Sequence, residues 1–202
     1  MSKMFRKDFS TICDDHHWLD LYLQIVNIMT DYWQYDFPPF FTIQPNDETR
    51  RLQMDVWCAI IMDYCRRNKL YELNISESLG QPPFRNDKIG RNLTEESLRI
   101  ILDEMVKRGR AEWLNVDGQT KQCLIYWLRI DEWADIIKQW VEDKGLNGTM
   151  CTLYEITQDE DRSDQQLFAL DERILMKALR FLEKDGKAVL VHIDDSYGVK
   201  FL

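Results

Sequence analysis

The pattern of apolar and polar positions predicts a long amphipathic helix early in the chain. An apolar stripe at helical spacing is formed by Leu52, Val56, Ile60 and Tyr64. It predicts a helix over residues 47–68, with Asn46 or Asp47 as its cap and a basic carboxyl end. We expect a strand over residues 70–75, a Gly-Pro loop and a short helix over residues 86–92 to follow.

A repeat at a spacing of 77 residues organises the rest of the chain. It pairs residues 93–98 with 170–175, and residues 109–111 with 186–188. Each copy predicts a capped helix, a glycine stop and a strand. A turn and a second strand are expected next, over residues 122–127 in the first copy and 199–202 in the second.

The segments upstream of each copy also resemble each other. Residues 70–73 (LYEL) match residues 153–156 (LYEI). The long helix has its counterpart over residues 131–144, capped by Asp131 and stopped by Gly145. Both halves then read helix, strand, short helix, helix, strand, turn, strand, which is the order of a winged helix. The chain is therefore predicted to be α+β, mostly α, with two tandem winged-helix domains.

The repeat divides the chain into four parts. Residues 1–31 form a variable extension, residues 32–46 a Pro/Phe-rich lead segment, and residues 47–128 and 129–202 the two domains. The extension carries apolar residues at helical spacing, namely Leu19, Tyr22, Leu23, Val26 and Met29. It could be an added amphipathic helix, or Met29 could be the true start, with the upstream residues an alternative or mispredicted exon.

The lead segment has an unusual composition, because residues 37–46 contain three prolines and three phenylalanines. Proline fixes φ, lacks a backbone donor and disfavours α conformation in the preceding residue, so we expect an extended or polyproline-like run. Its rings could plug a pocket of a partner. Alternatively, Phe37, Phe40 and Phe41 could pack back on their own domain as a strap, and the residues alone leave both possibilities open.

Composition and charge narrow the function classes. The chain has 202 residues, 45% hydrophobic and 30% charged, which is ordinary for a soluble protein of one or two domains. A net charge of -9 argues against nonspecific binding to nucleic acid. The cysteines have neither metal-ligand spacing nor a CxxC pair and are interpreted as reduced cytosolic thiols; they are Cys13, Cys58, Cys65, Cys123 and Cys151.

Catalytic and metal-binding motifs are not found. The sequence has no HExxH, no Gly-rich phosphate loop and no GxSxG elbow. The acidic run over residues 159–164 begins like a calcium loop, but it lacks the glycine at the sixth position and has Leu170 in place of the bidentate glutamate. We therefore expect no enzyme, no metal and no cofactor, and a solvated loop at this run.

A basic stripe keeps a second function class open. On the helix expected in the second copy, one side carries Arg173, Lys177, Arg180 and Lys184. Winged helices often bind DNA through this helix, so a DNA-binding transcriptional regulator is the alternative hypothesis. The helix of the first copy has a mixed charge, and the whole chain is acidic. A solvated face, or a site for an acidic partner, therefore fits the stripe better than nucleic acid does.

An ordered series of motifs carries a resemblance to a known family. These motifs are the aromatic residues 31–35, FPPFFTIQPN at 37–46, Thr49-Arg50, Glu132-Trp133, Gln139-Trp140-Val141, TLYEI at 152–156 and the terminal residues 198–201. Together they resemble the vacuolar protein-sorting-associated protein 25 family, a subunit of the ESCRT-II complex. The resemblance covers residues 29–202 and implies a non-enzymatic adaptor in the multivesicular-body sorting of ubiquitinated membrane proteins.

The resemblance also implies partners and docking residues. It implies that the lead segment docks onto the two other ESCRT-II subunits, vacuolar protein sorting 22 and 36. The residues that match the family's docking motif are Phe37, Pro38, Pro39, Phe40 and Phe41. The implied location is the cytoplasm, with peripheral recruitment to the endosome membrane through the complex.

A second implied surface lies on the second domain. In the family, this domain captures the first helix of an ESCRT-III subunit, charged multivesicular body protein 6, and so starts ESCRT-III assembly. The matching residues are Met150, Cys151, Thr152 and Leu153, on the strand expected to open the domain, and Lys200 near its end. Cys151 stands where a larger apolar side chain is expected, so the resemblance implies a weaker or rearranged contact there.

Overall fold

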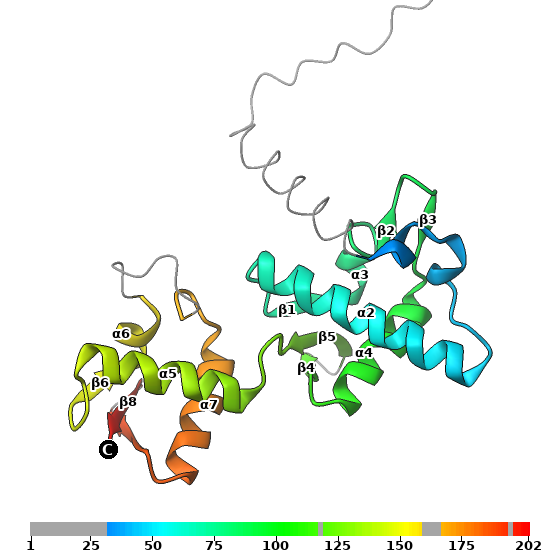
Figure 1. Ribbon diagram of the computed structural model, residues 1–202. Helices are drawn as coiled ribbons and strands as arrows, with labels where there is room; N and C mark the ends of the chain where they lie inside the picture. Colours follow the sequence, from blue (N-terminus) through cyan, green and yellow to red (C-terminus); the bar gives the residue numbers. More distant parts are fainter. Residues whose placement is uncertain (1–31, 117–118, 159–166, 194–195) are drawn as a thin grey trace, which may run out of the picture. The chain divides into compact units, whose positions relative to one another are not determined.

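The computed structural model of the protein describes residues 32–116, 119–158, 167–193 and 196–202 (Figure 1). The amphipathic helix expected within residues 1–31 and the acidic run over residues 159–164 lie outside these ranges. Contacts divide the chain into two compact units. The first contains the described residues up to Glu104 together with Leu114–Cys123, and the second contains Met105–Trp113 and Leu124–Leu202.

The long helix of the first unit is the one that the apolar stripe predicts. Helix α2 spans Asp47–Arg67, and the side chain of Asn46 caps it by accepting a hydrogen bond from the backbone N–H of Thr49, 3.0 Å away. Strand β1 (Glu72–Asn74) and the short helix α3 (Ile75–Ser78) follow it. Figure 1 shows α2 in cyan, with β1 and α3 next along the chain.

The short helix predicted over residues 86–92 is wrong, because this segment forms a hairpin. Strands β2 (Arg85–Asn86) and β3 (Arg91–Asn92) pair antiparallel. The side chain of Asn86 accepts a hydrogen bond from the backbone N–H of Lys88 and so starts a turn. Gly90 completes the turn with a φ of 60°, a conformation that favours glycine.

The repeat of 77 residues is present in the elements. Helix α4 (Glu95–Lys107) and strands β4 (Ala111–Val116) and β5 (Gln119–Ile125) form the first copy. Helix α7 (Glu172–Lys184) and strands β7 (Ala188–Ile193) and β8 (Ser196–Phe201) form the second. The start of every element in the second copy lies 77 residues after its counterpart, which confirms the duplication within these elements.

The two three-stranded sheets share one topology. Their strand orders are β1-β5-β4 and β6-β8-β7, where β6 spans Met150–Thr152. In each sheet, the last strand lies between the other two. Since β6 is thus the counterpart of β1, the proposed match between LYEL at 70–73 and LYEI at 153–156 is wrong. Thr152 and Glu155 form a capping box, so the second motif begins helix α6 (Leu153–Thr157) instead of a strand.

Helix α5 (Ile130–Lys144) ends as predicted but begins one residue earlier than expected. The backbone of Gly145 adopts the left-handed helical conformation, with φ 65° and ψ 32°, and this ends the helix. Asp131 is not the cap. Arg129 holds that position, and its backbone N–H donates a hydrogen bond to the carboxylate of Glu132. The buried face of α5 packs against α7 and forms the core of the second unit.

These elements make the fold α+β, as the sequence predicts, and each half has the element order of a winged helix. The boundary between residues 128 and 129 stays a prediction. By contact, the base of the hairpin formed by β4 and β5 groups with the second unit and its remainder with the first.

The lead segment is not extended throughout, contrary to the prediction. It folds into two short 3₁₀ helices, η1 (Trp33–Asp36) and η2 (Pro38–Phe41). Pro38 and Pro39, two of the three prolines, lie in the first turn of η2, where a missing N–H costs no hydrogen bond and the fixed φ suits a helix. The residues that flank η2, Phe37 and Thr42, keep extended backbone angles.

One buried side chain of α2 holds the lead segment in place. The amide nitrogen of Gln53 donates to the carbonyls of Phe40 and Thr42, each at 2.8 Å, and its oxygen accepts from the backbone N–H of Gln44 at 3.1 Å. The indole N–H of Trp57 also donates to the Phe40 carbonyl, at 3.2 Å. These bonds satisfy the backbone of a segment that has few bonds of its own.

We therefore expect Gln53→Leu to lower the free energy of unfolding by about 1–3 kcal/mol, because it removes three hydrogen bonds and takes the described acceptor away from the part-buried backbone N–H of Gln44. Urea denaturation of the two proteins measures the difference. The matched control is Arg51→Gln, on the exposed side of the same helix, which should change stability by less than about 0.5 kcal/mol. Equal midpoints for Gln53→Leu and the control would contradict this role.

Candidate functional site

An aromatic cluster takes up the two phenylalanine rings at the end of η2. The ring of Phe40 stacks on Trp57, with centroids 4.6 Å apart and planes at 11°, and Phe41 meets the same indole edge-on at 5.4 Å. Tyr35 meets Phe41 at 5.4 Å. All four side chains are buried. Two of the five predicted docking residues, Phe40 and Phe41, therefore pack on their own unit, as the strap alternative expected.

The exposed part of the lead segment lies on its other side. The side chain of Phe37 is 50% exposed and that of Trp33 is 72% exposed, and the two rings lie 6.3 Å apart. Together with Leu52, which is 55% exposed, they border a hollow of about 270 Å³. We call this hollow the apolar groove; Trp33, Phe37, Pro39, Leu52 and Val56 line it. It gathers three large exposed apolar side chains in one place.

Two residues that line this groove were not predicted from the sequence to be part of a binding surface. Trp33 was noted only as part of an aromatic run, and Leu52 was assigned to the buried stripe of the long helix. Of that stripe only Ile60 is buried, whereas Gln53 and Trp57 face inward. The buried face of α2 differs from the predicted one because the lead segment covers the side of the helix that carries Gln53 and Trp57.

Polar contacts fix η1 to the hairpin of β2 and β3. The hydroxyl of Tyr35 donates to the carbonyl of Arg85 at 2.8 Å, and the side-chain amide of Asn86 donates to the carbonyl of Tyr35 at 2.9 Å. Lys88 pairs with Asp36. Burial raises the pKa of Tyr35, and the hydrogen bond from Lys88 lowers the pKa of Asp36. Trp33 and Phe37 thus project from a backbone held on two sides.

A second exposed apolar surface lies on the sheet of the second unit. Met150 is opposite Lys200, and Lys200 is opposite Val189, so the three side chains form one row across β6, β8 and β7. Met150 is 49% exposed, Val189 is 42% exposed and Lys200 is exposed. We call these three residues the sheet row. A cation flanked by two apolar side chains can receive an acidic, amphipathic helix.

The other three residues expected on this surface lie in different environments. Thr152 is exposed on the same strand. Cys151 faces the core and lies opposite Val199, and both are buried. Burial raises the pKa of the Cys151 thiol. The prediction that Leu153 lies on the strand is wrong, because Leu153 is the first residue of α6.

Two members of the basic stripe on α7 are engaged within the second unit. Arg173 forms an ion pair with Asp171 at 2.7 Å, and Lys177 donates to the carboxylate of Glu112 at 2.6 Å. The hydroxyl of Tyr126 donates to the same carboxylate at 2.8 Å. A charge already paired within the protein gains less from a phosphate, so these contacts weaken the DNA-binding alternative.

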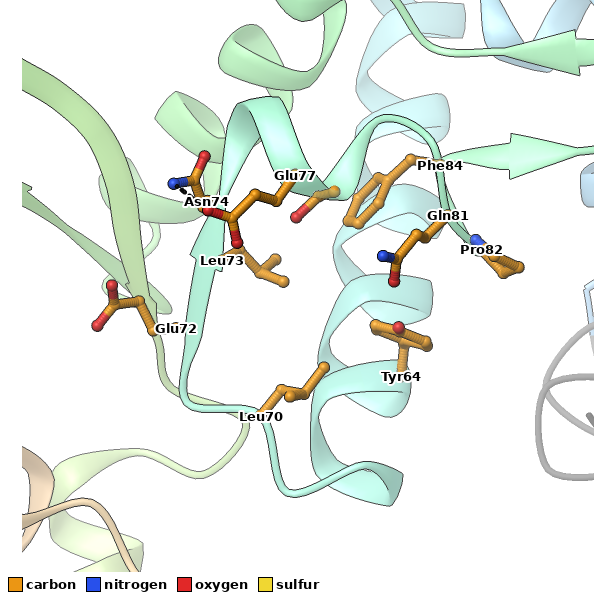
Figure 2. A pocket seen from close by; sticks show the side chains of 10 residues that line it. Tyr64, Leu70, Glu72, Leu73, Asn74, Glu77, Gln81, Pro82 and Phe84 are labelled. Atoms are coloured by element: carbon orange, nitrogen blue, oxygen red, sulfur yellow. Dashed lines mark hydrogen bonds between the residues drawn. The ribbon is translucent and has the colours of Figure 1, made fainter. Parts of the chain in front are cut away.

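A hollow lies between α2 and the segment of β1 and α3 (Figure 2), and its volume is about 140 Å³. Tyr64 lies on one side and meets Phe84 edge-on, 6.5 Å away, and burial raises the pKa of Tyr64. On the other side, the amide of Asn74 donates to Glu77 at 3.1 Å. The residues that line this hollow include no nucleophile paired with a base, so we assign it no chemistry.

Within its described residues, the chain has neither a metal-binding cluster nor a membrane-spanning helix. The described residues contain no group of three or more His, Cys, Asp or Glu side chains that could hold a metal ion. None of the helices in the described part of the chain is long and apolar enough to cross a membrane. The apolar groove and the sheet row are both suited to protein contacts.

These observations define a class, namely an α+β protein built from a duplicated winged-helix element order that carries exposed apolar surfaces. Comparison with known proteins then gives the family. The family model "ESCRT-II complex subunit" matches residues 34–171. Vacuolar protein-sorting-associated protein 25 of Danio rerio is 42% identical over 169 residues, which cover 84% of this chain and 96% of that protein. The chain belongs to the ESCRT-II subunit family.

Solved structures agree with this assignment. The crystal structure of subunit VPS25 of the endosomal trafficking complex ESCRT-II matches with a TM-score of 0.74 and 27% identity, covering 85% of this chain and 98% of that one. A chain of the endosomal complex ESCRT-II (VPS22/VPS25/VPS36) matches with a TM-score of 0.73 and 26% identity, covering 86% and 99%.

The contact between Glu112 and α7 can be tested by titration. The hydrogen bonds from Lys177 and Tyr126 lower the pKa of Glu112. The ionised carboxylate therefore stabilises the folded state above the ordinary pKa of a glutamate, and this contribution is lost as the pH falls through the lowered value. We expect Lys177→Gln to raise the pKa of Glu112, as measured by carbon NMR of its carboxyl group. Arg180→Gln, on the same helix, is the control, and identical titration curves for the two variants would contradict the contact.

Proposed function

We propose that this chain is a non-enzymatic adaptor that docks onto the two other ESCRT-II subunits, vacuolar protein sorting 22 and 36, through its apolar groove. The observation that carries the proposal is the gathering of Trp33, Phe37 and Leu52, all at least half exposed, around one hollow. Solved ESCRT-II complexes of related chains contain those two subunits, which supports this choice of partner.

The geometry divides the five docking residues into two roles. Phe37 and Pro39 border the groove and would contact the partner. Phe40 borders the same hollow but exposes only 6% of its surface. Together with the buried Phe41 and the half-buried Pro38, it would position the exposed residues instead. A segment fixed in advance by Gln53 and Trp57 loses little conformational entropy on binding. Affinity is then expected to depend on the aromatic side chains that become buried.

We expect Phe37→Ala to lower affinity for the two co-expressed partner subunits by about 2 kcal/mol or more, about thirtyfold in Kd, while stability changes little. Calorimetry and urea denaturation measure these two effects. The matched control is Ile100→Ala, an exposed apolar residue on α4. Phe40→Ala should instead lower the free energy of unfolding by about 3–5 kcal/mol, since that ring is buried. Unchanged affinity of the Phe37→Ala protein would contradict docking through the groove.

We further propose that the second unit recruits ESCRT-III by binding the first helix of charged multivesicular body protein 6 on the sheet row. The proposal rests on the family resemblance and on the placement of Met150, Lys200 and Val189 in one exposed row. In this scheme Lys200 pairs with an acidic side chain of the helix, while the apolar residues on both sides of it are buried by the contact. Cys151 would act from the core, by supporting β6.

This function would place the protein in the cytoplasm and bring it to the endosome membrane through its complex. There it would serve the multivesicular-body sorting of ubiquitinated membrane proteins. The two surfaces lie on different units, so one chain could hold the ESCRT-II core with the first and the ESCRT-III subunit with the second.

We expect Lys200→Glu to weaken binding of that first helix by about tenfold or more, since it puts two like charges side by side. Fluorescence anisotropy of a labelled helix peptide measures the affinity. The matched control is Lys121→Glu, because Lys121 is an exposed lysine on β5, the counterpart of β8 in the first sheet. If both variants bind as tightly as the unaltered chain, the sheet row is not the ESCRT-III site.

A further inference from the structure

The apolar groove is exposed within the described part of the chain. Trp33, Phe37 and Leu52 expose 72%, 50% and 55% of their surface, and they lie around one hollow. Contiguous apolar surface of this kind is usually covered by a partner, by a second copy or by the chain itself.

The groove begins two residues after the end of the first undescribed stretch of the chain. Residues 1–31 lie outside the described part of the chain, and Trp33 is the first residue that lines the groove. The end of the undescribed segment is therefore held beside the groove by chain continuity. A tethered segment needs only weak contacts to stay bound, because its effective concentration at the groove is high.

The sequence of this segment suits an apolar groove. Eight of its eleven residues over positions 19–29 are apolar. The three polar ones, Asp20, Gln24 and Asn27, recur at helical spacing and so would lie along one side of a helix. Such a helix would present a largely apolar surface. At about 1.5 Å per residue, residues 19–29 would span roughly 15 Å as a helix.

The relatives have little that corresponds to this segment. The matched relative from Danio rerio is covered over 96% of its length by only 84% of this chain, and the family model begins at residue 34. A stretch about as long as residues 1–31 therefore has no counterpart there. Binding by residues 19–29 would therefore come in addition to what the matched region, residues 34–171, does.

We propose that residues 19–29 bind in the apolar groove of their own chain and compete with the ESCRT-II partner for Phe37 and Leu52. The inference rests on the proposed function, since the regulated event is docking through the same groove. The bound segment lowers the affinity of the chain for the partner subunits. Release of the segment, or its removal, restores full affinity.

The first experiment measures the occupant directly and needs no partner. The photo-reactive amino acid p-benzoylphenylalanine replaces Phe37 in the full chain, and mass spectrometry locates the cross-link after irradiation. We expect cross-links to residues 19–29 that disappear in Leu23→Asp/Val26→Asp. The same probe at Ile100, an exposed residue of α4, should give none. Cross-links elsewhere, or between two copies of the chain, would overturn the proposal.

The second experiment measures competition. We expect the full chain with Leu23→Asp/Val26→Asp to bind the co-expressed partner subunits about tenfold more tightly than the unaltered chain. The control is Gln24→Glu/Asn27→Asp, which puts the same number of acidic residues on the polar face and should leave the affinity unchanged. Equal affinity of the apolar-face variant and the unaltered chain would overturn the competition.

The two experiments separate this inference from the function on which it rests. If none of the proteins binds the partner subunits, then docking through the groove is wrong, and the cross-link alone decides whether the segment occupies the groove. If all of them bind equally well and no cross-link forms to residues 19–29, docking stands and the intramolecular contact is rejected.

Discussion

The stack of Phe40 on Trp57 is the contact on which the first unit depends. It places an aromatic ring of the lead segment flat on the long helix, at a centroid distance of 4.6 Å, and the carbonyl of the same residue accepts hydrogen bonds from Gln53 and Trp57. Apolar and polar contacts thus converge on one residue. Because the stack buries one side of the lead segment, the rings of Trp33 and Phe37 are left on the other side, where a second protein can reach them.

The duplicated fold explains why the two surfaces differ. Both halves use the same strand order, so their cores are built alike. The two halves differ in the additional segments that pack on them. The first half carries the lead segment and the small hairpin of β2 and β3, joined through Tyr35 and Asn86. In the second half, the exposed face of the sheet carries Met150, Lys200 and Val189. One scaffold therefore offers a groove on a helix in one copy and a flat sheet in the other.

Local signals in the sequence were sufficient for most of the fold, and long-range contacts account for the rest. Asn46 and Gly145 bound their helices as predicted, because caps act within one turn. The inward face of α2 could not be predicted from its own residues. Gln53 is polar, and its burial depends on backbone groups of the lead segment nine to thirteen residues earlier in the chain. The same contacts leave Leu52 exposed, although its residue type favours the core.

The prolines of the lead segment have a different role from the one that their composition suggested. In an extended rod, they would stiffen a probe that projects into a partner. In the observed turn, Pro38 and Pro39 begin a 3₁₀ helix that directs Phe40 and Phe41 inward and leaves Phe37 outside. Proline restricts the unfolded chain to fewer conformations, so it favours this compact turn as readily as it favours a rod. The proposed docking motif is thus first a folding motif, and its partner would contact only the residues that folding leaves exposed.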